Sequence, residues 1–449
     1  MCCEEVEGNK ASRSVHSGVA GRSSAVYNRT VVSGHRSASR EMAMRRMTRR
    51  VSKVLITASI GSLGMFYASD ATFAGAVQSD AGPNGGQDFS HSLHVSEILL
   101  GGSLHHSFTL AGSTLVKVEA LSNPDDITRL GDELFVGFQN GVGPQGQASP
   151  DGNLDSTVVE LTLSGHVIGQ WDVVGKTDGL TADPSLGGVI ATVNEDANSA
   201  LYTIRPFAAS PTNVVTRYDY SEVLPHGGGT DAISIYNNQI FISASAPGTN
   251  GLAAPQPTYP AVYSVTLDPN TEVAKVAPLF DDEDSATVAN VSSPQFGKTT
   301  QLALTDPDSN EVVPFDASRF AGDFMLTSQG DQEQIYVGNA GSPHQRLSVV
   351  SLSQSVDDTA WPTAPQGALY STDSTNDSVD VVTGHFGDLP LVVATPCGAN
   401  SAPATCPAPG YSANYLAALN PWTGEITAMT VRGTPYVPQG GLAFIPFTP

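Results

Sequence analysis

The stretch TDGLTADPSLGGVIATVNEDANSALYTIRPF, residues 177–207, decides the fold. It opens with a turn rich in Gly and Asp and continues into two short apolar runs, GVIATV and ALYTI, separated by the polar residues NEDANS. Short β-branched and aromatic runs between turn-forming clusters are typical of antiparallel strands. A further run, NVVTRYDYS (213–221), follows the stretch, so residues 177–221 are expected to form a group of four strands.

The same order of turn and strands occurs at three places in the chain. The groups open with PDDITRLG (124–131), TDGLTADPSLG and GTDAISIYN (229–237), and Asp125, Asp178 and Asp231 in these openings are 53 residues apart in both intervals. Equal intervals indicate a structural repeat, and a repeat of four antiparallel strands is typical of a propeller blade. We therefore predict an all-β fold, a single β-propeller of about six four-stranded blades. Five or seven blades also fit, and a β-sandwich with insertions is the alternative.

Later openings are irregular. The next one, AGDFMLTSQGD (321–331), contains Asp323 and lies 92 residues beyond Asp231, so long loops or a degenerate blade are expected between them. The closing blade is expected to take strands from both parts of the chain that flank the repeats. These are GGLAFIP (440–446) on the C-terminal side and FTLAG (108–112) or LVKVEAL (115–121) on the N-terminal side.

The charge of the chain is distributed unevenly. Residues 1–76 carry 11 Lys and Arg against 5 Asp and Glu, whereas residues 77–449 have a formal net charge of −29. This acidic body excludes a nucleic-acid binder, whose footprint is a basic patch. An unknown small molecule, a glycan or a protein remains as the partner, and a monomer is expected.

The basic leader has the order of a secretory signal. A run of Arg and Lys ending at Lys53 precedes the apolar stretch 54–69, and the small residues FAGA (73–76) follow it. We expect cleavage after Ala76 and no stable membrane span, because the apolar stretch is shorter than the roughly 20 residues of a spanning helix. Residues 1–43 are interpreted as a non-native or disordered upstream extension, 44–76 as the signal peptide, 77–106 as a flexible linker and 107–449 as the propeller. The protein is then secreted or resides in the periplasm or cell envelope.

Cysteine usage agrees with export. Of the four cysteines, only Cys397 and Cys406 lie beyond the predicted signal, in the loop CGANSAPATC. In an oxidising compartment two cysteines this close are expected to form a disulfide. A zinc site is the alternative, but the spacing does not fit one and no His lies nearby.

Acidic residues recur where the predicted blades open, and these positions converge on the channel of a propeller. The candidate ligand or metal residues are Asp125, Asp126, Asp178, Asp231 and Asp323. Converging carboxylates repel one another, so they must bind a divalent cation, with calcium as the candidate, or hold protons. The alternative is that each Asp caps the backbone amides of its own turn.

Other polar residues give weaker indications. His226 in PHGGGTD is a candidate general base, with an ordinary polar turn residue as the alternative. The acidic cluster 306–311 is expected in a loop as solvated charge, or secondarily as a weak calcium site, and it lacks the Gly and Glu of an EF-hand. No role is assigned to the linker histidines His91, His94, His105 and His106.

Two segments carry a family resemblance. TDGLTADPSLG resembles the N-D-G-x-x-x-D-P-x-G turn of SMP-30/gluconolactonase propellers, with Thr177 in place of the Asn, and LYSTDSTNDSVDVV (369–382) is similar to the strand pair of an NHL repeat. The resemblance covers residues 107–449 at the level of the fold. It implies a divalent metal at the channel mouth, held by acidic and Asn side chains, that polarises a lactone carbonyl.

Two functional hypotheses follow. The first is an exported, non-catalytic propeller that binds a small molecule, a glycan or a protein at its channel mouth, because no complete catalytic constellation is found. The second is a metal-dependent hydrolase of lactone type. The sequence does not decide whether the protein is an enzyme.

Overall fold

The computed structural model describes residues 87–88, 93–225, 228–245, 258–395, 414–431, 434–438 and 440–447. They belong to one compact unit, Ala76–Pro449. The described residues form β-strands, turns and two 3-10 turns, η2 (Gly101–Ser103) and η3 (Pro211–Asn213), so the prediction of an all-β protein is confirmed. No helix among them has the length and hydropathy required to cross a membrane.

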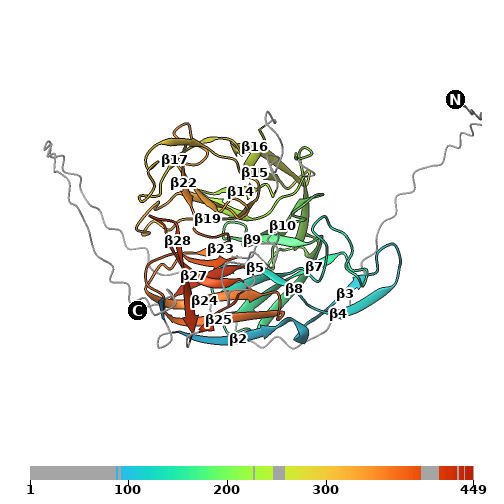
Figure 1. Cartoon of the computed structure of the whole chain (residues 1–449). Coiled ribbons are helices and arrows are strands. Elements are labelled where there is room, and N and C mark those ends of the chain that lie inside the picture. Colours follow the sequence, from blue (N-terminus) through green and yellow to red (C-terminus); the bar gives the residue numbers. More distant parts are fainter. Residues whose placement is uncertain are drawn as a thin grey trace, which may run out of the picture. The chain divides into compact units, whose positions relative to one another are not determined.

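Most strands pair antiparallel with a neighbour along the chain, and the sheets are arranged as in Figure 1. One sheet contains four strands: β5 (Pro124–Leu130), β6 (Glu133–Phe138), β7 (Asp155–Thr162) and β8 (Val167–Val174). The next sheet contains eight: β9 (Thr177–Asp183), β10 (Gly188–Val193), β11 (Ala200–Ile204), β12 (Val215–Tyr220), β13 (Ile233–Tyr236), β14 (Gln239–Ser243), β15 (Pro260–Asp268) and β16 (Val273–Asp281). Its two halves are joined by a parallel pairing of β12 with β16.

Three further sheets complete the arrangement. One consists of β17 (Ser285–Val288), β18 (Thr299–Gln301), β19 (Pro307–Val312), β20 (Phe324–Ser328), β21 (Glu333–Gly338) and β22 (Arg346–Ser351). Another consists of β23 (Val356–Ala360), β26 (Leu391–Ala394), β27 (Tyr415–Asn420) and β28 (Glu425–Val431), with β1 (Gln87–Asp88) and β29 (Thr434–Pro435) at its edge. The last consists of β2 (His94–Leu100), β24 (Gln366–Asp373), β25 (Ser378–His385) and β30 (Leu442–Pro446).

The arrangement of the sheets is that of a β-propeller. Their inner strands contact one another in turn, in the order β5, β9, β13, β19, β23, β30 and back to β5. Apolar side chains fill the space between adjacent sheets, as Phe135 and Val158 of one sheet do against Val189 and Tyr202 of the next. Facing sheets that bury both surfaces explain why strands such as β10 and β11 are apolar at nearly every position.

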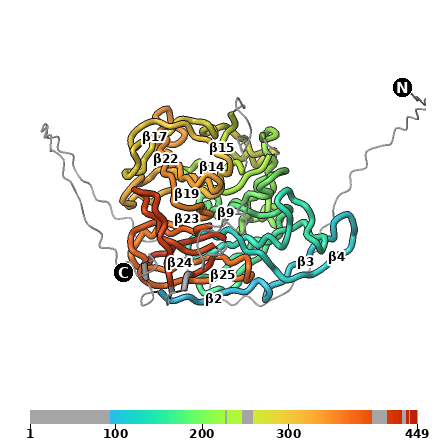
Figure 2. The backbone as a smooth tube through the Cα atoms, in the orientation of Figure 1, coloured from blue at the N-terminus to red at the C-terminus, as the bar shows by residue number. Residues whose placement is uncertain are grey.

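The closing sheet draws on distant parts of the chain. In Figure 2, β2 lies beside β25. The strand pairings give the order β2, β25, β24, β30 across the sheet. The strand β30 matches the expected C-terminal contribution. The N-terminal contribution comes from residues 94–100, inside the stretch 77–106 for which the sequence predicts a linker.

The segments 108–112 and 115–121 do not supply the closing strand. They contribute to a separate hairpin of β3 (His105–Thr109) and β4 (Val116–Ala120). The side chains of Val116 and Val118 are 67% exposed, whereas Leu99 of β2 is 7% exposed and belongs to a core cluster. The apolar run of β4 therefore does not pack in the core, which is why it misled the sequence-based choice.

Candidate functional site

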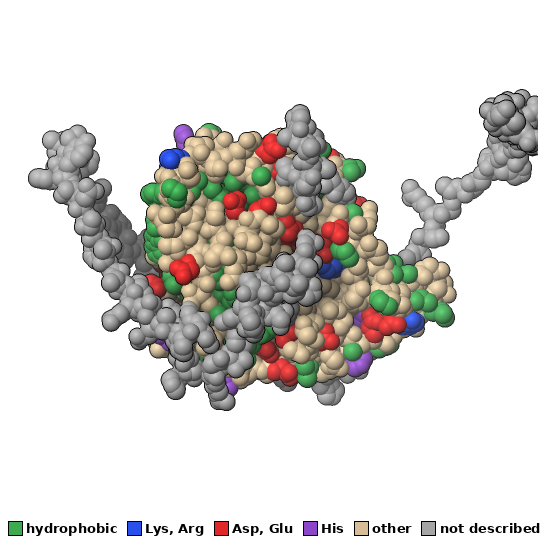
Figure 3. Space-filling view, viewed as in Figure 1, with side chains coloured by type: hydrophobic (Ala, Val, Ile, Leu, Met, Phe, Trp, Pro, Cys, Tyr) green, Lys and Arg blue, Asp and Glu red, His purple; other side chains and the backbone are tan. Residues whose placement is uncertain are grey.

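The inner strands surround a cavity of about 660 Å³. Its lining includes two cationic side chains, Arg129 and Lys176, and a much larger set of acidic ones. The acidic residues are Asp125, Asp126, Asp178, Glu195, Asp231, Asp308, Glu311, Asp357 and Asp358. Acidic side chains are also spread over the face shown in Figure 3, where Lys and Arg are few. Such a cavity attracts cations and repels anions.

A repeated β-bulge occurs at six of these carboxylates, which are Asp125, Asp126, Asp178, Asp308, Asp357 and Asp358. Pro124 pairs with Phe138 and Ile127 with Val136, so Asp125 and Asp126 together lie opposite one residue of β6. The register of three other inner strands shifts at the equivalent place, which holds the pairs 178–179, 308–309 and 357–358. A bulge turns a side chain away from the regular alternation, and bulges are common beside functional sites.

Hydroxyl groups of the second strands bind the backbone of two cavity aspartates, Asp308 at its bulge and Asp231 just before β13. Ser243 Oγ of β14 donates to the backbone oxygen of Asp308 at 2.8 Å, and Thr192 Oγ1 of β10 donates to that of Asp231. Asp308 is in β19 and Asp231 lies just before β13, and each of these is the inner strand that follows in the ring. The backbone of each aspartate is therefore held by the neighbouring strands.

Three of the carboxylates form a compact group. Oxygen atoms of Asp178, Glu195 and Asp231 all lie within 4.8 Å of one another. Asp178 is in β9, Glu195 follows β10, and Asp231 precedes β13. Asp178 and Asp231 are only 7% and 8% exposed. Residues from three chain segments thus meet at one point near the channel axis.

Lys176 is the cation that belongs to this group. Its Nζ atom contacts Glu195 Oε1 and lies 3.7 Å from Asp178 Oδ1. Burial alone lowers the pKa of Lys176, but the charges of Asp178, Glu195 and Asp125 outweigh that effect and raise it. The ammonium group is therefore charged throughout the ordinary pH range and offsets part of the negative charge.

Burial and like charges raise the pKa of most carboxyl groups here. Burial, followed by the charge of Asp178, raises the pKa of Asp125 and Asp231 and brings that of Glu195 to about 8. Asp178 differs, because its contacts with Asp231 and Lys176 overcome the effect of burial and lower its pKa. Within the trio, the ionised form is therefore favoured at Asp178 and disfavoured at Glu195 and Asp231.

Two other carboxylates join adjacent sheets. Asp126 Oδ1 accepts the backbone N–H of Ile127 and its Oδ2 accepts that of Leu180, both at 2.6 Å. Asp358 Oδ2 accepts the backbone N–H of Leu442, also at 2.6 Å. Leu180 and Leu442 lie in the next inner strands, β9 and β30. The contact of Asp126 with Ile127 is that of the capping alternative that the sequence left open, whereas its contact with Leu180 reaches the next sheet.

The sequence-predicted site residues are only partly brought together. Asp125, Asp126, Asp178 and Asp231 line the cavity, and Asp323 does not. Asp323 precedes β20, the second strand of its sheet, where its backbone oxygen accepts the N–H of Val313. His226 lies outside the described residues, as do Cys397 and Cys406, and the predicted general base and disulfide stay predictions.

Several residues that line the cavity were not predicted from the sequence. The cluster 306–311, interpreted there as solvated loop charge, instead provides β19, and its Asp308 and Glu311 line the cavity. Asp357 and Asp358 repeat the Asp-Asp pair that opens the first group, and this signal was available in the sequence. Glu195 and Lys176 lie in connections between strands, and no pattern identified them.

The donor set fits a hard divalent cation. Calcium takes only oxygen ligands, at about 2.3–2.6 Å, so oxygens on opposite sides of the ion are about 5 Å apart. The oxygens of the trio Asp178, Glu195 and Asp231 lie within 4.8 Å of one another, which is compatible with this spacing. Asp178 Oδ2 is buried and has no hydrogen-bond partner of good geometry among the described residues, so this oxygen is available to an ion. Thr177, which replaces the family's Asn, is buried and does not line the cavity.

Comparisons with known proteins give a likeness of fold alone. No family model and no curated protein matches the chain. A periplasmic gluconolactonase of Pseudomonas aeruginosa is similar in structure, with 14% identity, a TM-score of 0.36 and coverage of 78% of this chain and 99% of that one. Kuenenia stuttgartiensis hydrazine synthase has 12% identity, a TM-score of 0.33 and coverage of 69% of each chain. A Desulfotomaculum acetoxidans protein of unknown function has 10% identity, a TM-score of 0.39 and coverage of 80% and 100%. At such values function has to be inferred from the site itself.

Proposed function

We propose that this chain is an exported β-propeller protein that binds a divalent cation, calcium by preference, in its central channel. The observation that carries the proposal is the convergence of Asp178, Glu195 and Asp231 within 4.8 Å. The cation offers its remaining coordination positions to a small molecule, a glycan or a protein at the channel mouth. Apart from the group that contacts the ion, the ligand should be neutral or positively charged, because the acidic lining repels other anionic groups.

Calorimetric titration of calcium into the purified protein tests this proposal. We expect D178N and D231N to weaken calcium binding by about 100-fold or more, since each removes a charged ligand from a site with few others. D323N is the matched control, because Asp323 does not line the cavity and its replacement leaves affinity unchanged. Equal affinity in all three variants and the unaltered protein would rule the site out.

Calcium affinity is expected to rise with pH. The pKa of Glu195 is about 8, so at pH 6 this carboxyl group holds a proton that the cation must displace. Metal binding that releases a proton strengthens as pH increases. We expect at least about a tenfold gain in affinity between pH 6 and pH 9, with proton uptake by the buffer in calorimetry. An E195Q variant should lose most of this pH dependence.

A metal-dependent hydrolase of lactone type is the second candidate, and one observation favours it. Glu195, whose pKa is about 8, is itself one of the three carboxylates, and a carboxyl group poised near the working pH is suited to proton transfer. The bound ion would supply polarisation of a carbonyl group. Assays with a series of lactones, with and without chelator, separate the candidates, because a binding protein gives no chelator-sensitive turnover.

The blade count belongs to the same proposal. We interpret the eight-stranded sheet as two blades, β9–β12 and β13–β16, that share an edge through the β12–β16 pairing. Together with the four other inner strands of the ring, this interpretation yields six blades. It is supported by the equivalent bulges of β5, β9, β19 and β23.

A further inference from the structure

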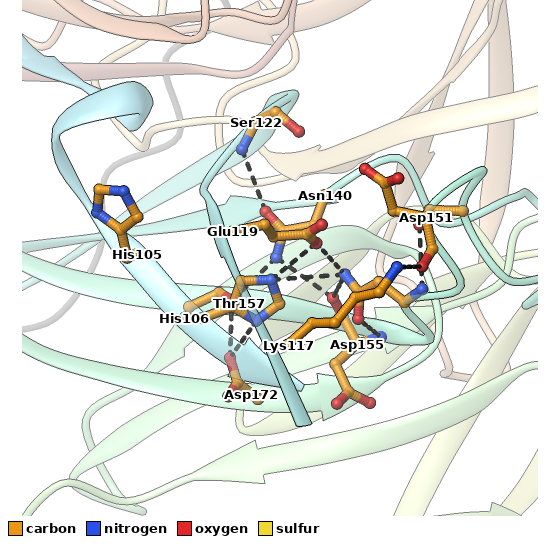
Figure 4. A network of polar contacts seen from close by, with 12 residues as sticks. His105, His106, Lys117, Glu119, Ser122, Asn140, Asp151, Asp155, Thr157 and Asp172 are labelled. Carbon is orange, nitrogen blue, oxygen red and sulfur yellow. Dashed lines mark hydrogen bonds and ion pairs between the residues drawn. The ribbon is translucent and has the colours of Figure 1, made fainter. Parts of the chain in front are cut away.

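The β3–β4 hairpin is attached to the sheet β5–β8 through a buried histidine (Figure 4). His106 of β3 lies between two carboxylates, with Nε2 3.0 Å from Glu119 Oε1 and Nδ1 3.3 Å from Asp172 Oδ1. Glu119 belongs to the hairpin itself, whereas Asp172 belongs to β8. Since the side chain of His106 is only 2% exposed, water does not replace these contacts when they are lost.

Both carboxylates are held in place by other side chains. Asn153 Nδ2 donates to Glu119 Oε1 at 2.8 Å, and Thr157 Oγ1 donates to Asp172 Oδ1 at 2.7 Å. An imidazolium ion has an N–H on each ring nitrogen, so Nε2 can donate to Glu119 while the positive ring pairs with Asp172 through the Nδ1 side, a contact that lacks the geometry of a hydrogen bond. A neutral imidazole has only one N–H, so its other nitrogen presents a lone pair to a carboxylate oxygen. The arrangement therefore suits the charged form of His106.

Two further charged groups lie near this contact. Asp155 of β7 interacts electrostatically with both Asp172 and His106. Lys117 of β4 donates to the backbone oxygen of Asp151 at 2.8 Å and so binds the adjoining loop. Burial by itself lowers the pKa of His106, but the contacts with Asp172 and Glu119 outweigh it and raise the pKa above its ordinary value.

The hairpin also supports a loop that reaches toward the channel. Residues 139–154 connect β6 to β7, and Asp151 and Asn153 in this loop are the groups bound by Lys117 and Glu119. At the other side of the loop, the backbone oxygen of Pro144 accepts the N–H of Asp196 at 3.0 Å. Asp196 is the neighbour of Glu195, so a continuous set of contacts joins the hairpin to the cation trio.

We propose that His106 is a pH-sensitive latch that fastens the β3–β4 hairpin and the loop 139–154 to the propeller when protonated and releases them when neutral. Because the folded form binds the proton more tightly than the unfolded form, the latch is fully closed below the usual pKa of histidine, about 6.5. It opens as the pH rises through the raised pKa. The fastening of the hairpin does not rest on the proposed cation site; only the link from the loop through Asp196 to Glu195 concerns that site.

Hydrogen–deuterium exchange of the calcium-free protein, corrected for intrinsic exchange, tests the latch. Peptides from 105–120 and 139–154 are expected to exchange about tenfold faster at pH 9 than at pH 6. In H106Q, which carries no imidazole, exchange is fast at both values. H105Q is the matched control, since His105 is exposed, lies on the opposite face of β3 and leaves the pH response intact.

A D172N variant and a proton titration complete the test. D172N removes one charged partner, so the latch is expected to open at a lower pH than in the unaltered protein, and the imidazole of His106 titrates at a lower pH by NMR. Equal exchange of both segments at pH 6 and pH 9, or an unchanged pH response in H106Q, would overturn the latch. Calcium titration of H106Q at pH 6 is read separately, so a failed cation site leaves the exchange result interpretable.

Discussion

Replacement of Lys176 by methionine is expected to tighten calcium binding at least about tenfold. The ammonium group occupies the carboxylate cluster, in contact with Glu195 and 3.7 Å from Asp178. Two unit charges about 4 Å apart interact by about 4 kcal/mol at an effective dielectric constant of 20. Loss of even a third of such repulsion toward the incoming ion changes a binding constant about tenfold.

The same substitution makes the stability of the protein depend on calcium. Without the ion, K176M removes the cation that interacts with Glu195, Asp178 and Asp125, and the protein is expected to melt at a lower temperature than the unaltered chain. Added calcium should restore most of the loss. K275M serves as the control, because Lys275 is 61% exposed and pairs with Asp268 at the surface. If K176M bound calcium no better than K275M, the ammonium group would not share its site with the ion.

Replacement of Asp126 by alanine is expected to destabilise the fold by about 2 kcal/mol or more, since it strands two buried N–H donors that cost about 1–3 kcal/mol each. These donors are the backbone amides of Ile127 and Leu180. Burial and the charge of Asp358 raise the pKa of Asp126, so removal of this carboxyl group also relieves some repulsion. For that reason the lower part of the range is expected. Denaturant unfolding gives the free energy directly.

The two predictions separate structural carboxylates from ligand carboxylates. Calcium affinity should change little in D126A, because Asp126 is not part of the trio, although the protein is less stable. D132A is the control for stability, since the side chain of Asp132 is 97% exposed. If D126A unfolded at the same denaturant concentration as D132A, the junction between β5 and β9 would depend on other contacts.

The repeat could be read from the sequence because three openings are evenly spaced. Asp125, Asp178 and Asp231 all line the cavity, in agreement with their equivalent places in the groups. The regularity ends after Asp231, because β17 and β18 are inserted before the next inner strand. The equivalent residue is Asp308, 77 residues further on, and the choice of Asp323 followed the apolar run of β20 instead.

The cation trio could be predicted only in part. Asp178 and Asp231 belong to the repeat. Glu195 lies in the turn after β10, and residue spacing does not predict which way a side chain in a turn points. Its place in the cavity depends on the path of the chain between β10 and β11 and on contacts with the loop 139–154. Such contacts between loops arise from tertiary packing and do not produce a periodic pattern in the sequence.

The closing sheet can form only after the C-terminal part of the chain has been synthesised. Strands β2 and β30 flank the hairpin β24–β25, and β30 is made more than 300 residues after β2. At a synthesis rate of about 5–20 residues per second, β2 waits roughly 15–70 seconds before the ring can close. Contacts so distant in sequence form slowly even in a complete chain. A protein built in this way cannot complete its closing sheet until β30 has been synthesised.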